Sequence, residues 1–348
     1  MLCAIIVAAC KKDGGTAPPV TVDATATPVT LLSVSSPTKD EDPSVLRARD
    51  GSLYIAWFSD RGGQSNIYVS RSTDKTAWSA PVKLTSNIHG NFYPNLMQDA
   101  QGVLHIVWFE WVTLRVGQIR HATSTNGLTW SAEEAVTTEF LLDDWVPSIA
   151  EAPDGSLIVV FASEKRGGQP DVAELYSVRK RPGASAWDAP VRMSVNSVAE
   201  HDQLPYIART GAGLTLVWVR HDARDRNFIT NPKSELHLAT SPDGITWSAP
   251  QKITTHTGNV ANLFPQLFAR HDGAWAILWL STRSGSARQY EMPLSRVSDF
   301  PAGIQQNTFL PDGYSHRQTA TTTPGEYLAA WVQGADGVQD IYYRYIKR

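Results

Sequence analysis

The chain has 348 residues, enough for one large domain or two ordinary ones and for a sizeable buried core. Its 31 basic against 34 acidic side chains give a net charge of −3, which argues against a nucleic-acid-binding surface because phosphate recognition favours a basic field. A composition of 42% hydrophobic and 19% charged residues excludes a disordered chain and one made of membrane spans. The twelve tryptophans need an explanation.

Both cysteines, Cys3 and Cys10, lie in the apolar segment 1–10, so no disulfide or thiolate metal site is expected after it. The segment is shorter than the roughly 20 residues that a transmembrane helix needs. Its end, Val-Ala-Ala-Cys at 7–10, resembles the lipobox of bacterial lipoprotein signals. The resemblance implies an exported protein held at the cell envelope by a lipid on Cys10, although the charged start of a signal peptide is missing. The alternative is an apolar N-terminus without function.

Residues 11–27 are rich in Gly, Ala, Pro and Thr and are typical of a flexible tether. The folded part is therefore expected to span residues 28–348. We expect this part to lie in water as a monomer, with contact to a membrane only through the N-terminal lipid.

A strand pattern recurs six times in the folded part. Each copy has an apolar segment with an aromatic residue, a glycine five or six residues before it and, in five copies, a proline thirteen or fourteen residues before it. In the sixth copy Arg317 stands fourteen residues before the aromatic residue. Turns such as Asp-Gly between two extended runs indicate a tight hairpin. The aromatic residues are Trp57, Trp108, Phe161, Trp218, Trp279 and Trp331.

The apolar segment of each copy is hydrophobic on both alternating faces, as happens when sheets stack radially. We therefore predict an all-β fold, a six-bladed β-propeller of four-stranded antiparallel blades. The last copy supplies only three strands, and the segment 28–33 resembles the fourth strands elsewhere. That N-terminal strand is expected to complete the last blade and hide its edge.

The turns between the third and fourth strands share a Ser-x-Asp-x-Gly-x-x-Trp pattern. The copy from Ser241 to Trp247 matches fully, whereas the others depart at one or more positions. The pattern resembles the Asp-box, or BNR repeat, of the sialidase superfamily over about residues 28–348. In that family the boxes stabilise turns on the face opposite the active site, which implies a structural role. The expected box residues are Ser72, Asp74, Trp78, Ser124, Asn126, Trp130, Trp187, Ser241, Asp243 and Trp247.

The same resemblance implies a site in a central funnel on the other face, where three arginines would clamp a substrate carboxylate and a Tyr–Glu pair with an Asp would do the chemistry. The candidate catalytic residues are Tyr314, Glu200 and Asp60. The first arginine of the family is absent, because Glu41-Asp42-Pro43 stands in its place. A carboxylate there would repel a sialic acid. Candidate substrate-binding residues are Arg61, Arg166, Arg220, Arg283, Arg317, Trp111, Trp145, Asp143, Asp144 and His201.

Trp111 and Trp145 lie outside the repeat, and the sequence predicts that they stack on a sugar ring beside Asp143 and Asp144. The alternative is that both pack under their own loops. The leading hypothesis is a glycan-recognising propeller; the others are an active exo-sialidase or related retaining glycoside hydrolase, and an interaction scaffold of the envelope. No cofactor and no zinc are expected, and a structural calcium at Asp143 and Asp144 is left open.

Overall fold

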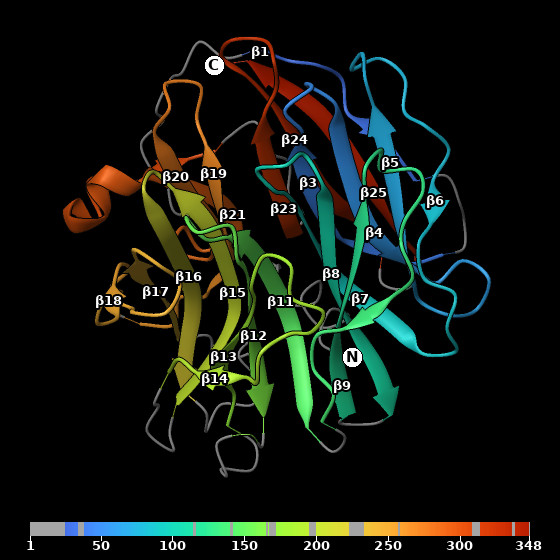
Figure 1. The fold of residues 1–348 in the computed structure, drawn as a ribbon. Coiled ribbons are helices and arrows are strands. Elements are labelled where there is room, and N and C mark those ends of the chain that lie inside the picture. Colours follow the sequence, from blue (N-terminus) through green and yellow to red (C-terminus); the bar gives the residue numbers. More distant parts are fainter. Residues whose placement is uncertain are drawn as a thin grey trace.

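A computed structural model describes residues 25–33, 38–113, 116–139, 142–164, 166, 172–194, 200–222, 233–256, 258–307, 314–335 and 338–347. The predicted signal segment 1–10 with Cys10 and most of the predicted tether lie outside these residues. The described part is almost entirely β-structure, with the short 3-10 helix η2 (Leu294–Asp299) at the edge of the molecule (Figure 1). None of its helices is long and apolar enough to cross a membrane.

The strands form five hydrogen-bonded sheets. Three have four strands: β3 (Asp40–Arg47), β4 (Leu53–Ser59), β5 (Asn66–Ser72) and β6 (Val82–Lys83); β15 (Glu200–Thr210), β16 (Gly213–Asp222), β17 (Ser234–Ser241) and β18 (Gln251–Lys252); β19 (Asn262–Ala269), β20 (Trp275–Ser281), β21 (Arg288–Pro293) and β22 (Gln305–Gln306). One has five: β23 (Tyr314–Ala320), β24 (Glu326–Ala335) and β25 (Val338–Lys347) with β1 (Thr25–Ala26) and β2 (Thr30–Leu31). The eight-stranded sheet holds β7 (Gly90–Gln98), β8 (Leu104–Thr113), β9 (Val116–Ser124), β10 (Glu134–Ala135), β11 (Asp143–Glu151), β12 (Leu157–Glu164), β13 (Glu174–Lys180) and β14 (Val191–Arg192).

The expectation of six separate four-stranded sheets is not met. Four sheets hold one repeat each, whereas repeats 2 and 3 share the eight-stranded sheet through one parallel residue pair, Asp143 with Gly117. Gly117 explains the junction, because a Cβ atom there would lie 2.6 Å from the carbonyl oxygen of Asp144. The missing side chain lets β9 approach β11 closely enough for the Gly117 N–H to donate to Leu142 O.

The first strands of the repeats form a closed ring. Each contacts the next in the order β3, β7, β11, β15, β19 and β23, and β23 contacts β3 again; in Figure 1 the sheets are arranged around this common centre. A parallel bridge between Lys39 and Gln339 further ties β25 to the first repeat. The N-terminal strands add to the last sheet, where Thr30 and Leu31 pair with Tyr343 and Tyr342. That residues 28–33 act as a full closing strand stays a prediction.

Every first strand has a bulge at the same place. The register shifts lie at the Pro43, Pro94, Pro147, Pro205, Pro265 and His316 positions. The residue just before each has a left-handed φ between 48° and 55° although none is glycine; they are Asp42, Tyr93, Val146, Leu204, Phe264 and Ser315. Because Arg317 follows the bulge, His316 and not Arg317 takes the proline position of the sixth repeat, which corrects the sequence count.

Hydrogen bonds join successive first strands just after the bulge. The backbone N–H of Leu96 donates to Ser44 Oγ at 3.0 Å, and that of Ile149 donates to Asn95 Oδ1 at 3.0 Å. Gln266 makes the same bond to Gln318 N at 2.8 Å and donates to its carbonyl oxygen as well. These side chains satisfy backbone groups that no ladder reaches, because neighbouring inner strands do not pair.

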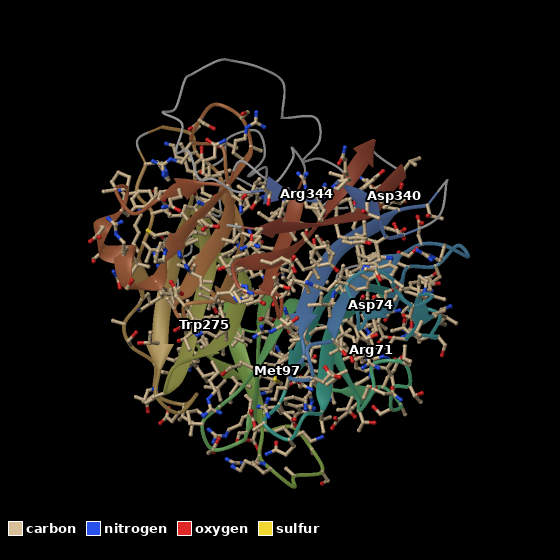
Figure 2. The ribbon with its side chains drawn as sticks, turned by 90° about the horizontal axis from the view of Figure 1, so that it is seen from above. Arg71, Asp74, Met97, Trp275, Asp340 and Arg344 are labelled. Atoms are coloured by element: carbon tan, nitrogen blue, oxygen red, sulfur yellow. The ribbon has the colours of Figure 1, made fainter. Side chains whose placement is uncertain are left out.

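The predicted box turns are held by local hydrogen bonds. Asp243 Oδ1 accepts from the N–H groups of Ile245 and Thr246 at 2.8 Å each, and Ser241 Oγ accepts from Gly244. Asn126 makes the same two bonds in repeat 2, since an amide oxygen accepts as a carboxylate does. Figure 2 labels Asp74 just beyond Arg71, where the corresponding turn of repeat 1 leaves β5.

Each of these turns packs on the preceding repeat. Trp78 lies 5.4 Å from Tyr343 of the last repeat, and Trp187 lies 5.4 Å from His121 of repeat 2. Trp130 and Trp247 pack on the cores between repeats 1 and 2 and between repeats 3 and 4. The strand tryptophans are almost completely buried, so most of the tryptophan excess belongs to the scaffold, as the repeat predicts.

Substitution of Gly127 tests the packing of the turns on the preceding repeat. Its φ is +72°, and a Cβ atom there would lie 2.1 Å from the Tyr54 ring, whereas Gly183 has φ +76° with open space around it. Gly127→Ala is expected to lower the free energy of unfolding by about 2–4 kcal/mol through clash and backbone strain, and Gly183→Ala by about 1 kcal/mol through strain alone. Urea unfolding measures both; equal losses would contradict the close contact.

Candidate functional site

Three of the predicted substrate-binding arginines are paired with carboxylates of their own repeats. Arg220 Nε and Nη2 donate to Asp202 at 2.7 Å each, and both residues belong to repeat 4. Arg166 donates to Asp144 in repeat 3, and Arg61 to Asp40 in repeat 1. The three carboxylates are fully buried. Each guanidinium is therefore the counter-ion of a carboxylate in its own sheet, and the convergence of the three on one ligand stays a prediction.

The pairing follows from the repeat. Asp40, Asn91, Asp144, Asp202 and Asn262 stand three residues before the proline of each bulge. In repeats 2 and 5 the residue is an amide that accepts from the indole N–H of the strand tryptophan at 2.9 and 3.1 Å. Where the position is a buried carboxylate, a guanidinium from the end of the second strand or from the loop after it neutralises the charge, since a lone buried charge is strongly destabilising.

Arg283 differs from these three because its repeat has Asn262 in place of the aspartate. Its guanidinium packs over the Tyr290 and Phe300 rings at 5.5 and 5.4 Å, and its Nη1 is buried without a hydrogen-bond partner. Desolvation lowers the pKa of Arg283.

The two predicted sugar-stacking tryptophans are half-buried. Trp111 lies 6.2 Å from Phe92 and 6.4 Å from Phe109, and Trp145 packs against three hydrophobic clusters. Both pack against the cluster around Phe109 and Phe161, and packing accounts for most of their surface. A contact with sugar stays a prediction.

His201 is also engaged inside the protein. Its Nδ1 accepts from Ala173 N at 2.8 Å, and its ring stacks on His221 at 4.8 Å. Asp143 pairs with Glu164 at the start of β11.

The candidate catalytic residues lie in different repeats. Glu200 opens β15 with a side chain that is 42% exposed and lies 3.9 Å from Arg220. Asp60 Oδ1 accepts from Lys39 N at 2.7 Å in repeat 1. Tyr314 opens β23, opposite Val332, but its side chain is outside the described part of the structure. A catalytic role for these three residues stays a prediction.

A further cluster, which the sequence pattern does not reveal, lies where the inner strands meet. We call the residues just before the bulges, Asp42, Tyr93, Val146, Leu204, Phe264 and Ser315, the axial ring. Ser315 Oγ donates to Asp42 Oδ1 at 3.3 Å across β23 and β3, and Val146, Leu204 and Phe264 share one core cluster across β11, β15 and β19. The ring thus has a polar arc from repeats 6, 1 and 2 and an apolar arc from repeats 3, 4 and 5.

Arg317 reaches this ring from the position after the sixth bulge. Its Nη1 donates to the carbonyl oxygens of His316 and Phe264 at 3.0 and 3.5 Å. Burial lowers the pKa of the Arg317 guanidinium, while the nearby Tyr206, Asp42 and Tyr93 act in the opposite direction. Tyr206 also lies close to Gln266 and Asn95, so it bridges the centre from repeat 4 to repeats 5 and 2.

Asp42 is the perturbed acid of the ring. Its side chain is buried, and its Oδ2 has no hydrogen-bond partner. Burial, together with the charge of the adjacent Glu41, raises the pKa of Asp42 to about 8, although Arg317, Ser315 and Lys39 act to lower it. Lys39 Nζ lies 3.1 Å from Glu41 Oε2. Asp42 therefore keeps its proton at neutral pH.

A perturbed acid at the convergence of several strands is a feature of functional sites. The signal in the sequence is the Glu41-Asp42-Pro43 motif, which the family resemblance explains only as the loss of an arginine.

Among the described residues no group of three or more His, Cys, Asp or Glu side chains is arranged to hold a metal ion. Both carboxylate oxygens of Asp144 accept hydrogen bonds from Arg166 and Ser163. These bonds disfavour Asp144 as a ligand of the structural calcium that the sequence left open. That no cofactor is needed stays a prediction.

No protein-family model and no curated protein sequence matches the chain. Solved structures do resemble it. A protein of unknown function from Dyadobacter fermentans aligns with a TM-score of 0.74 at 14% identity, over 93% of this chain and 99% of that one. The Penicillium chrysogenum α-L-arabinanase in complex with arabinobiose aligns at 0.68 and 13%, over 93% and 98%.

A Hadza microbial sialidase aligns with a TM-score of 0.58 at 15% identity, over 88% of this chain and 65% of that one. At such low identities the similarity shows the fold alone. The described chain has an all-β propeller fold.

The pairing of Arg220 with Asp202 gives a test of its structural role. Arg220→Leu is expected to cost about 2–4 kcal/mol, because it leaves the buried Asp202 unpaired. Adding Asp202→Asn removes the unpaired charge and keeps an oxygen that can accept from the Trp218 indole N–H, as Asn262 accepts from Trp279, so it should recover most of the loss. Urea unfolding of the single and double variants decides the point; a double variant no more stable than Arg220→Leu would contradict this account.

Proposed function

We propose that this protein is a carbohydrate-active propeller that binds a sugar unit at the axial ring. The observation that carries the proposal is the division of the ring into a polar and an apolar arc. A sugar has an apolar face of C–H groups and an edge of hydroxyl groups, and sites for such ligands combine apolar walls with a few convergent polar groups. Asp42, Tyr93, Ser315 and Arg317 supply those groups here.

The structural neighbours support this proposal at the level of the fold. Propellers that align over most of the chain are an arabinanase in complex with arabinobiose and a sialidase. A clamp of three arginines, which sialic acid would need, is not favoured, because Arg61, Arg166 and Arg220 are bound to carboxylates of their own repeats.

Hydrolysis of a glycosidic bond is the second candidate function. It is favoured by Asp42, a carboxyl group that holds its proton at neutral pH beside Glu41. An acid of this kind fits the protonation of a departing sugar oxygen.

The finer architecture is also part of the proposal. We propose that the eight-stranded sheet is two blades, which would make six in all, and that the Ser-x-Asp turns are Asp-boxes on the side away from the start of the inner strands; the single residue pair that joins the two halves supports the division. The sequence of residues 7–27 supports export and a lipid anchor at Cys10 in the bacterial cell envelope. Such an anchor would leave the propeller free to meet glycans outside the membrane; Cys10→Ala is expected to release the protein from the membrane fraction.

Binding is tested with a panel of neutral and acidic oligosaccharides, including arabino-oligosaccharides and sialosides, by calorimetry. Tyr93→Phe removes one hydroxyl group from the axial ring and is expected to weaken binding about three- to tenfold. Tyr176→Phe is the matched control, since its hydroxyl group lies beside Glu174 in β13. Reducing-sugar release in the same samples separates a hydrolase from a binding protein.

A folded sample that binds no member of the panel would reject the carbohydrate proposal and favour an interaction scaffold. Binding that survives Tyr93→Phe but is lost in Trp111→Ala and Trp145→Ala would move the site away from the axial ring, to the position that the sequence predicted.

A further inference from the structure

We propose that His89 is a second sugar-binding residue, at the start of the inner strand of repeat 2, where its Nε2 atom accepts a hydrogen bond from a hydroxyl group of the glycan. The inference rests on the proposed carbohydrate function and adds a contact away from the axis of the ring. It therefore makes the ligand an oligosaccharide and not a single sugar.

A buried carboxylate orients the His89 ring. His89 Nδ1 lies 2.8 Å from Glu110 Oε1, and the Glu110 side chain is only 3% exposed. The other carboxylate oxygen of Glu110 accepts from Arg120 Nε, so this carboxylate is ionised and has no proton to give. The hydrogen between the two side chains therefore belongs to His89 Nδ1, which leaves Nε2 of the neutral ring as an acceptor.

The Nε2 atom of His89 is open to solvent. The side chain is 30% exposed, and in the part of the chain that the structure describes the hydrogen bonds of the ring end at Nδ1. Nε2 is not one of the buried polar atoms that lack a partner. An acceptor that solvent reaches and that the protein itself does not use is available to a hydroxyl group of a ligand.

The loop before β7 holds the backbone of His89 in place. Asn87 Oδ1 accepts from His89 N at 3.1 Å and from Asn91 Nδ2 at 2.9 Å. Asn91 Nδ2 also donates to His89 O at 2.9 Å, and Asn91 N donates to Ser65 O of repeat 1 at 2.9 Å. The ring is thus positioned before a ligand arrives, which lowers the entropy cost of binding.

Charge neutralisation does not account for His89. The buried aspartates of repeats 1, 3 and 4 are each paired with one arginine, and Glu110 already has Arg120 in the same role. His89 is therefore an additional partner of Glu110. A carboxylate that fixes the tautomer and direction of an imidazole, with the other ring nitrogen free, is an arrangement that functional histidines use.

The place of His89 in the chain sets its distance from the axial ring. It directly precedes β7, at the end of the molecule where the inner strands start, and Tyr93 of the axial ring follows four residues later. At about 3.3 Å per residue the two Cα atoms are at most about 13 Å apart. This span is longer than one sugar ring, so a ligand seated at the axial ring reaches His89 only with a further sugar unit.

Two substitutions separate the nitrogen atoms of His89. His89→Asn keeps an amide N–H that can donate to Glu110 and removes Nε2, whereas His89→Gln places an amide group near the position of Nε2. The probes are arabinotriose, galactotriose and sialyllactose, each compared with its single sugar by calorimetry. His89→Asn is expected to bind the trisaccharide about three- to tenfold more weakly, with the affinity for the single sugar unchanged, and His89→Gln should keep most of the affinity.

His271→Asn is the matched control. It lies in the turn after β19, at the other end of the inner strands, where its Nε2 is 2.7 Å from Glu326 O. This variant should bind the trisaccharide as the wild type does. Urea unfolding of each variant shows that the sample is folded.

Chemical modification tests the wild-type protein without any substitution. Diethyl pyrocarbonate acylates unprotonated imidazole nitrogen atoms that solvent reaches, and peptide mass spectrometry locates the product. His89 is expected to react in the free protein, and to react about tenfold more slowly when about nine-tenths of the protein has bound the trisaccharide.

Unchanged affinity for the trisaccharide in His89→Asn would overturn the proposal, as would an equal loss for the single sugar. So would a wild type that binds the trisaccharide no more tightly than the single sugar, or a reaction at His89 that the bound glycan does not slow. In these cases glycan binding stands and only the role of His89 fails. If none of the three trisaccharides binds to the folded protein, the proposed function fails and this inference fails with it.

Discussion

The bulge in each inner strand is the constraint on which the rest of the molecule depends. It holds one non-glycine residue per repeat in a left-handed conformation, which costs on the order of 1 kcal/mol or more each. The strain is offset because the bulge turns the next side chain towards the neighbouring inner strand. Ser44, Asn95, Ser148 and Gln266 use that position to bind backbone groups of the next repeat. Sheets that share no ladder at the centre are joined there by side chains.

The same bulges decide what lies at the centre. They place six residues around the axis. These residues lie at register shifts, outside the regular hydrogen-bond ladder between the first and second strands, so the repeat does not fix their residue type. The sequence has filled three places with apolar residues and the others with Asp42, Tyr93 and Ser315. The sixth repeat, where His316 replaces proline, adds Arg317 from the following position. A uniform scaffold thus ends in a site with a polar side and an apolar side.

The charged side chains are arranged differently away from the axis and at it. Away from the axis, carboxylates and guanidinium groups are paired within a repeat, so they stabilise the sheet and leave no net field. At the axis, Asp42 is uncharged at neutral pH and Arg317 is charged. The Arg317 guanidinium is hydrogen-bonded to two carbonyl oxygens, whereas each of the outer arginines is paired with a buried aspartate.

The sequence by itself determined the all-β repeat, the aromatic residues of the second strands and the turns held by Asp or Asn side chains. These features depend on local residue spacing, which recurs in each repeat. It did not determine the partners of Arg61, Arg166 and Arg220, since a polar loop residue has the same appearance whether it faces a ligand or a buried carboxylate. Nor did it reveal that Gly117 joins repeats 2 and 3, or that Arg317 follows the bulge. Only the tertiary structure decided these points, because each depends on which strands meet at the axis and how far burial shifts the charge of Asp42.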